Sequence, residues 1–218
     1  MKYANFKEHK ITRTCTVQFD KPRKYVKYLK RDFHCRCCYC NMHEDLVAVP
    51  YHVEHFIPEK IFKNKKDYLK TDYENLMWSC PKCNLSKGDK YKGDIENNSQ
   101  IVNELFYNPV YTDYNTIFYR NELGGIDSDD PKGREMIKML KLYRPLHNLG
   151  WLLERLEKMC DQLEIAINKE KDPERKRLLE LAAGKLAREY VKKVKVFRAA
   201  YKGNKVFVQN RDAELDGE

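Results

Sequence analysis

Two Cys-x-x-Cys pairs, Cys37/Cys40 and Cys80/Cys83, constrain this chain more than any other feature of its sequence. The two intervening residues allow both sulfurs of a pair to reach one ion at ~2.3 Å, and four thiolates complete a closed tetrahedral shell. Such a shell is typical of structural zinc, whose binding stabilises a small fold. The pairs therefore predict a zinc site that joins the two ends of the segment between them.

The cysteines also indicate a reducing compartment. The chain has eight of them, and residues 1–10 are polar and charged, unlike a secretory signal. We find no apolar run near the ~20 residues of a membrane span, so we expect a cytoplasmic protein with reduced thiols. Cys35 and Cys38 offer a second possible register for the first pair. We favour Cys37 and Cys40 because Cys40 leads directly into the following segment.

The charge of the chain favours an acidic partner. Lys and Arg number 42 against 33 Asp and Glu, which gives a formal net charge of +9. Basic residues concentrate in residues 1–36 and 174–205. Two basic blocks are suited to following a phosphate backbone, so nucleic acid is the expected partner.

Hydrophobic periodicity and turn signals divide the chain into four regions. Residues 1–34 form a basic arm, 35–100 hold the cysteine motifs, 101–130 predict an extended hairpin or connector, and 131–218 predict a helical region. Within the second region we predict strands near 50–56 and 75–79. A helix follows, beginning by 82–84, and the whole corresponds to an α+β fold class.

Between the cysteine pairs lies a group of residues suited to phosphodiester hydrolysis. Strand alternation places His52 and Glu54 on one side and leaves His55 near the strand end. A histidine next to a carboxylate can thus place a base and a metal ligand on either side of one phosphate. Asn75 precedes the second cysteine pair and Asn84 follows it, at the expected start of the helix.

The combined pattern resembles the HNH endonuclease family, in the branch with four zinc cysteines and Asn as the final residue. The match covers roughly residues 35–90 and rests on these pieces: Cys37-x-x-Cys40, Val53-Glu54-His55-Phe56-Ile57-Pro58, Asn75-Leu76, Cys80-x-x-Cys83-Asn84 and Lys87-Gly88.

The resemblance implies a zinc-bound ββα-metal core that cuts DNA, expected to be double-stranded, with one Mg²⁺ or Mn²⁺ ion. It implies that His55 is the general base and that Glu54 and Asn84 hold the ion. It further implies that Asn75 hydrogen-bonds the His55 ring and that Lys87 contacts phosphate. Glutamate at position 54 departs from the aspartate common in the family, which leaves the metal geometry open.

The region from Phe118 to Arg155 is loosely similar to HNH proteins that are paired with ATPases in bacterial phage defence. That similarity implies an antiviral effector whose C-terminal helices bind a protein partner such as an ATPase. The basic face of the last helix could instead bind DNA or simply be solvated. For the whole chain, the alternative to a nuclease is a non-catalytic zinc module that binds nucleic acid or a partner.

Overall fold

The computed structural model describes residues 2–47, 49–96 and 100–202. The chain divides into two compact units, Met1–Arg144 and Pro145–Glu218. The first unit therefore combines the predicted arm, core and connector with the helix after residue 130. Residues 203–218, the end of the predicted C-terminal region, lie outside the described part.

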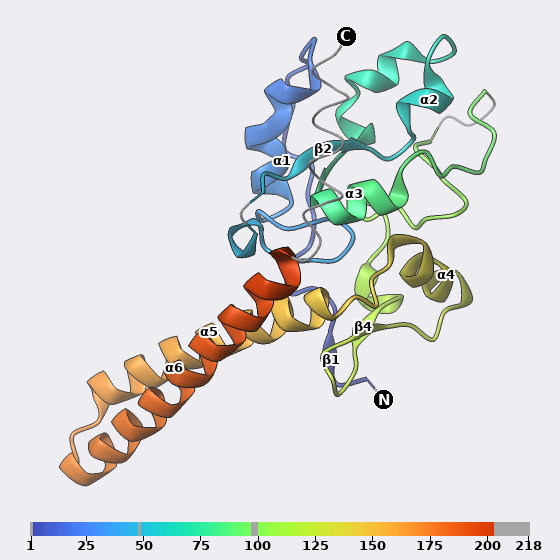
Figure 1. Cartoon of the computed structure of the whole chain (residues 1–218). Helices are drawn as coiled ribbons and strands as arrows, with labels where there is room; N and C mark the ends of the chain where they lie inside the picture. Colours follow the sequence, from blue (N-terminus) through green and yellow to red (C-terminus); the bar gives the residue numbers. More distant parts are fainter. Residues whose placement is uncertain (1, 48, 97–99, 203–218) are drawn as a thin grey trace. The chain divides into compact units, whose positions relative to one another are not determined.

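The first unit mixes short strands with short helices (Figure 1), so the predicted α+β class is confirmed. Its strands and α-helices are β1 (Ala4–Asn5), α1 (Val26–Asp32), β2 (His52–His55), α2 (Glu59–Phe62), β3 (Leu76–Ser79), α3 (Pro81–Lys87), β4 (Tyr119–Arg120), β5 (Ile126–Asp127) and α4 (Pro131–Leu140). Its 3₁₀ helices are η1 (Pro22–Tyr25), η2 (Glu44–Leu46), η3 (Asp67–Lys70), η4 (Tyr73–Asn75) and η5 (Tyr114–Thr116).

The centre of this unit is a β2–β3 hairpin followed directly by α3. The strands are antiparallel and pair His52 with Ser79 and His55 with Leu76. Every residue of β3 is buried. The helix begins where Cys80 caps it and Pro81 occupies its first turn, and it ends before Gly88, whose φ of +50° favours glycine. The predicted ββα order is present.

The N-terminal segment packs into the unit and does not project from it. Asp32 is buried and accepts hydrogen bonds from Thr14 N at 2.7 Å and from the Tyr73 hydroxyl at 2.8 Å. Burial alone would raise the pKa of Asp32, but these hydrogen bonds outweigh it and lower the pKa. Tyr25 stacks on Tyr73 with ring centroids 5.1 Å apart. The helical turn η1 and the helix α1 of the predicted basic arm therefore have a packing role.

A second small sheet has the strand order β1-β4-β5. It brings the first residues of the chain against residues 119–127, and the Phe6 ring lies 5.4 Å from the Phe118 ring. The following helix α4 starts at an Asp130 cap that accepts from Gly133 N. It ends at Leu140 because Lys141 adopts a left-handed conformation, with φ +54°.

The second unit contains α5 (Pro145–Lys169) and α6 (Pro173–Lys202), which pack along each other (Figure 1). Residues 170–172 separate them, and Asp172 caps α6 by accepting from Arg175 N at 2.8 Å. Neither these nor any other helix in the described ranges has both the length and the apolar character that crossing a membrane requires.

Candidate metal and nuclease site

The structure brings four cysteine side chains to one point. The Sγ atoms of Cys37, Cys40, Cys80 and Cys83 all lie within 4.8 Å of one another, and all four residues are buried. Four sulfurs around one Zn²⁺ at the usual bond length are separated by about 3.8 Å. The Sγ atoms of Cys40 and Cys80 are 3.9 Å apart. The cluster therefore fits a structural zinc ion.

Local turns place the two cysteine pairs. After the first pair, Asn41 N donates to Cys37 O at 2.9 Å, and Asn41 adopts φ +62°, which Asn tolerates better than most residues. In the second pair, Cys83 N donates to the Cys80 sulfur at 3.4 Å. The cluster contains Cys37 and Cys40, so the register is the predicted one. Cys35 is only partly buried and lies outside the cluster.

Lys7 is a buried cation beside this cluster. Its Nζ donates to Cys38 O at 2.8 Å. Burial lowers the pKa of Lys7 to about 8, although the neighbouring cysteines act in the opposite direction. A positive charge at this position can offset part of the negative charge of four thiolates. Lys7 was not predicted from the sequence, because no motif spacing connects residue 7 to the cysteine pair that begins thirty residues later.

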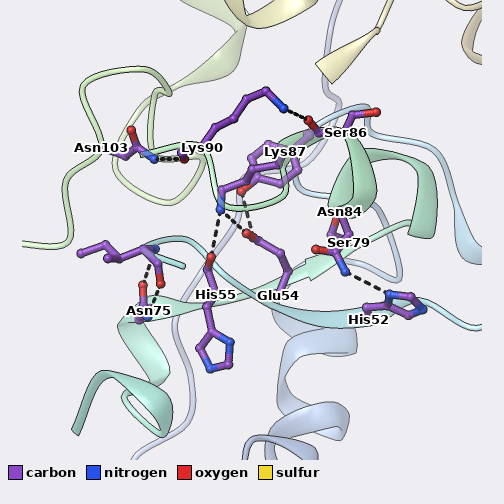
Figure 2. Close-up of polar contacts among 12 residues, drawn as sticks. His52, Glu54, His55, Asn75, Ser79, Asn84, Ser86, Lys87, Lys90 and Asn103 are labelled. Carbon is purple, nitrogen blue, oxygen red and sulfur yellow. Dashed lines mark hydrogen bonds and ion pairs between the residues drawn. The ribbon is translucent and has the colours of Figure 1, made fainter. Parts of the chain in front are cut away.

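The strand β2 presents consecutive residues to opposite sides (Figure 2). His52 and Glu54 face α3, where they meet Asn84 and Lys87 respectively. These two helix residues are three positions apart and therefore share a face. His55 points away from α3. The hairpin and helix thus separate the carboxylate from the imidazole, as strand alternation predicts.

On the α3 side, Glu54 lies in a closed network. Its Oε1 pairs with Lys87 Nζ at 2.5 Å, and its Oε2 accepts from the Tyr39 hydroxyl at 2.9 Å. Burial and the nearby carboxylate raise the pKa of Tyr39 well above its usual value, so this hydroxyl remains a donor. Tyr39 was not predicted from the sequence as a site residue. Its position between Cys37 and Cys40 could have indicated this role, because the cysteine cluster orients that turn.

Lys87 is fully buried, with 0% of its surface exposed. Besides Glu54, its ammonium binds the His55 carbonyl oxygen at 3.0 Å. The prediction that Lys87 contacts phosphate is therefore wrong, because the side chain is occupied inside the protein. Lys87 instead connects α3 to the β2 residues on which the proposed chemistry depends.

Asn84 lies on the same side of β2 as Glu54, but it is partly exposed whereas Glu54 is buried. Its Nδ2 is 3.0 Å from Nδ1 of His52, and Figure 2 shows the two side chains pointing toward each other. An amide nitrogen donates, so His52 Nδ1 is the acceptor in this pair. The arrangement holds the Asn84 amide in one orientation between β2 and α3.

On the opposite side, His55 contacts the segment that follows β2. Its Nε2 lies 3.0 Å from Lys70 O, and its ring meets Phe62 edge to face with centroids 5.6 Å apart. A carbonyl oxygen can only accept, so Nε2 carries a proton, and in the neutral form of the ring Nδ1 holds the lone pair. His55 is partly exposed.

Asn75 is placed near His55, but it bonds to backbone groups. It accepts from Ile57 N at 2.8 Å and donates to Ile57 O at 3.2 Å and Leu69 O at 3.0 Å. The predicted hydrogen bond to the His55 ring is therefore wrong. Lys70 O contacts that ring, and Asn75 instead holds the backbone at Ile57 and at Leu69, on either side of α2.

The residues on the α3 side have the donor types that a hard divalent cation accepts. Each oxygen of Glu54 engages one protein donor and, as a carboxylate oxygen, has a second lone pair. Asn84 supplies an amide oxygen, the other ligand type that Mg²⁺ and Mn²⁺ prefer. The types of these donors suit the predicted catalytic ion, while the buried Lys87 ammonium at 2.5 Å already balances the charge of Glu54.

Comparison with known proteins identifies one region of the chain. The family model for HNH endonucleases matches residues 35–90, which include both cysteine pairs, β2, β3 and α3. Neither a curated protein nor a solved structure gives a match.

Proposed function

Because residues 35–90 belong to the HNH endonuclease family, we propose that the protein is a metal-dependent endonuclease that hydrolyses the phosphodiester bonds of double-stranded DNA. The main supporting observation is the divergence of two consecutive residues of β2, with Glu54 facing α3 and His55 facing the opposite side. A phosphate at the end of β2 could therefore meet a carboxylate site on one side and an imidazole on the other.

In this proposal His55 removes a proton from the attacking water. The Lys70 carbonyl holds the ring in the tautomer that leaves Nδ1 unprotonated, which is the form that a general base needs. Phe62 packs against the same ring and restricts its rotation. The neutral form of the imidazole can therefore accept a proton at Nδ1 without reorientation of the ring.

The α3 side supplies the proposed cation site. Glu54 and Asn84 would hold Mg²⁺ or Mn²⁺, and His52 orients the Asn84 amide. When bound, such an ion stabilises the charge that develops on the phosphate and the departing oxygen. Lys87 and Tyr39 hold the Glu54 carboxylate in place from within the protein. The four-cysteine cluster, with its proposed zinc ion, connects the start of the segment to α3.

Plasmid cleavage tests this proposal. The zinc-loaded protein should cut DNA with added Mg²⁺ or Mn²⁺, and His55→Ala should lower the rate by about 10²- to 10⁴-fold. His43→Ala is the matched control, since His43 caps η2 and should leave the rate unchanged. Full activity in the folded His55→Ala variant would exclude His55 as the base. DNA binding without cleavage in the wild-type protein would favour the non-catalytic module.

We further propose that the protein works in the cytoplasm as an antiviral effector and that α5 and α6 bind a protein partner such as an ATPase. Support comes from the similarity between residues 118–155 and HNH proteins of bacterial phage defence, and from exposed apolar side chains on α6. Leu178 and Leu181 are 62% and 54% exposed. Replacing both with Glu should abolish co-purification with the partner and leave plasmid cleavage by the isolated protein intact.

A further inference from the structure

Residues 59–70, which we call the lysine loop, follow β2 directly and include α2 and η3. The loop contains five lysines and two acidic residues, a net charge of +3 within twelve positions. The stretch connects β2 to η4 and β3. Its charge and its contacts with His55 suggest a function of its own.

The loop touches the proposed general base at two points. Lys70 contributes the carbonyl that holds the His55 ring, and Phe62 contributes the ring that packs against it. Figure 1 shows α2 just beyond the end of β2. The lysine side chains are therefore carried by the same segment that orients the imidazole, on the side of β2 away from the Glu54 network.

The loop has a defined conformation. Phe62 and Leu69 are each 1% exposed, and α2 packs against η3. Asn75 binds Leu69 O, and Asp67 accepts from Asn64 N at 2.7 Å. Because buried side chains and hydrogen bonds hold the loop, the backbone positions that carry its lysines are fixed.

The outward side of the loop is cationic. Lys60, Lys63, Lys65 and Lys70 are exposed. Lys70 pairs with Glu59 at 3.1 Å and Lys65 with Glu96 at 3.0 Å. Both are exposed pairs, which contribute little stability and exchange readily with other anions. Among the described residues, neither Lys60 nor Lys63 forms an ion pair. Positive charge is therefore available on the segment that contacts His55.

We propose that the lysine loop binds the phosphate backbone of duplex DNA next to the phosphodiester bond that is cleaved by the water His55 deprotonates. This inference rests on the proposed nuclease function and names the element that holds the substrate. Duplex is favoured over single strands because single-strand binding uses several exposed aromatic rings. In this loop Phe62 is buried and Tyr68, 58% exposed, is the one exposed aromatic residue. Lysine ammonium groups instead match phosphates as point charges.

The test measures binding separately from cleavage. In the zinc-loaded His55→Ala protein, Lys60, Lys63 and Lys65 are changed together to Gln. Affinity for a short labelled duplex is measured by fluorescence anisotropy between about 50 and 200 mM salt. The matched control changes Lys158, Lys169 and Lys171 to Gln. These are three exposed lysines of the second unit that lie outside the basic block 174–205, so the control removes the same charge.

We expect the loop variant to bind more weakly on every DNA sequence, with the salt slope reduced by about 1 for each lysine that contacts a phosphate. The control should keep the parent slope. Equal losses in both variants, an unchanged slope in the loop variant, or tighter binding of single strands than of duplex would each overturn the proposal. The two proposals can fail separately. If the loop variant loses salt slope but the wild-type protein does not cut DNA, the loop still binds duplex DNA and the nuclease function is rejected.

Discussion

The cysteine cluster and the β2 site differ in how their residues come together. Four sulfurs converge from two short turns to within 4.8 Å. Glu54 and His55, adjacent in the sequence, diverge to opposite sides of one strand. A closed metal site requires its ligands to converge on one point, whereas a site that encloses a phosphate requires groups on two sides. The same hairpin and helix serve both arrangements.

The two regions also balance charge differently. At the cluster, Lys7 lies among buried cysteines. At β2, Lys87 neutralises Glu54 inside the protein, while the positive charges of the lysine loop remain outside. The buried cations make contacts inside the protein, and the exposed ones are those that we propose to meet the substrate. Mutations in the two regions should therefore separate stability from activity.

The largest effect should come from the cluster. Cys83→Ser removes one of four thiolates, and structural zinc contributes about 10–16 kcal/mol of binding free energy in small zinc domains. We expect the zinc content and the melting temperature to fall together, measured by metal analysis and thermal unfolding. Cys160→Ser, on α5, is the control and should change neither. An unaltered zinc stoichiometry in Cys83→Ser would rule out the cluster as the zinc site.

The next largest effect should come from Lys87→Met, which leaves the Glu54 carboxylate buried without its partner. Breaking a buried ion pair costs about 3–5 kcal/mol. Urea unfolding should show this loss, while exposed Lys90→Met should stay within about 0.5 kcal/mol of wild type. The double variant Glu54→Gln/Lys87→Met should recover most of the stability. If Lys87→Met alone is as stable as wild type, the buried pair is not formed.

A smaller effect is expected for Asn75→Ala, which leaves backbone groups of Ile57 and Leu69 without their partner. A buried group deprived of its hydrogen bond costs about 1–3 kcal/mol. The free energy of unfolding should fall by this amount, and cleavage should slow because the segment behind His55 loosens. Zinc content should not change. Asn84→Ala is the control for stability, since its amide is partly exposed; equal losses in both variants would contradict the assigned role.

Much of the local structure could be predicted from spacing and pattern. The strands near 50–56 and 75–79 and the helix after Cys80 appear close to their predicted bounds, and α4, α5 and α6 lie in the region predicted to be helical. These features depend on nearby residues: caps, prolines and alternation. The N-terminal segment was harder to place, because its contacts with Tyr73 and Phe118 join residues far apart in the chain.

The roles of single polar residues could be predicted less well. Lys87 and Asn75 were expected at a phosphate and at the His55 ring, and both instead bind inside the protein. A motif gives the residue type and its spacing, but the direction of a side chain depends on which neighbours bury it. Tyr39 and Lys7 illustrate the same point, since their partners come from distant segments.

The sequence by itself determined that four thiols share a site and that a carboxylate and an imidazole leave opposite sides of one strand end, because chain geometry limits where close neighbours can lie. The tertiary structure alone decided which cations are buried and which remain in solvent. That choice depends on packing between segments that are distant in the chain, and no local pattern encodes it.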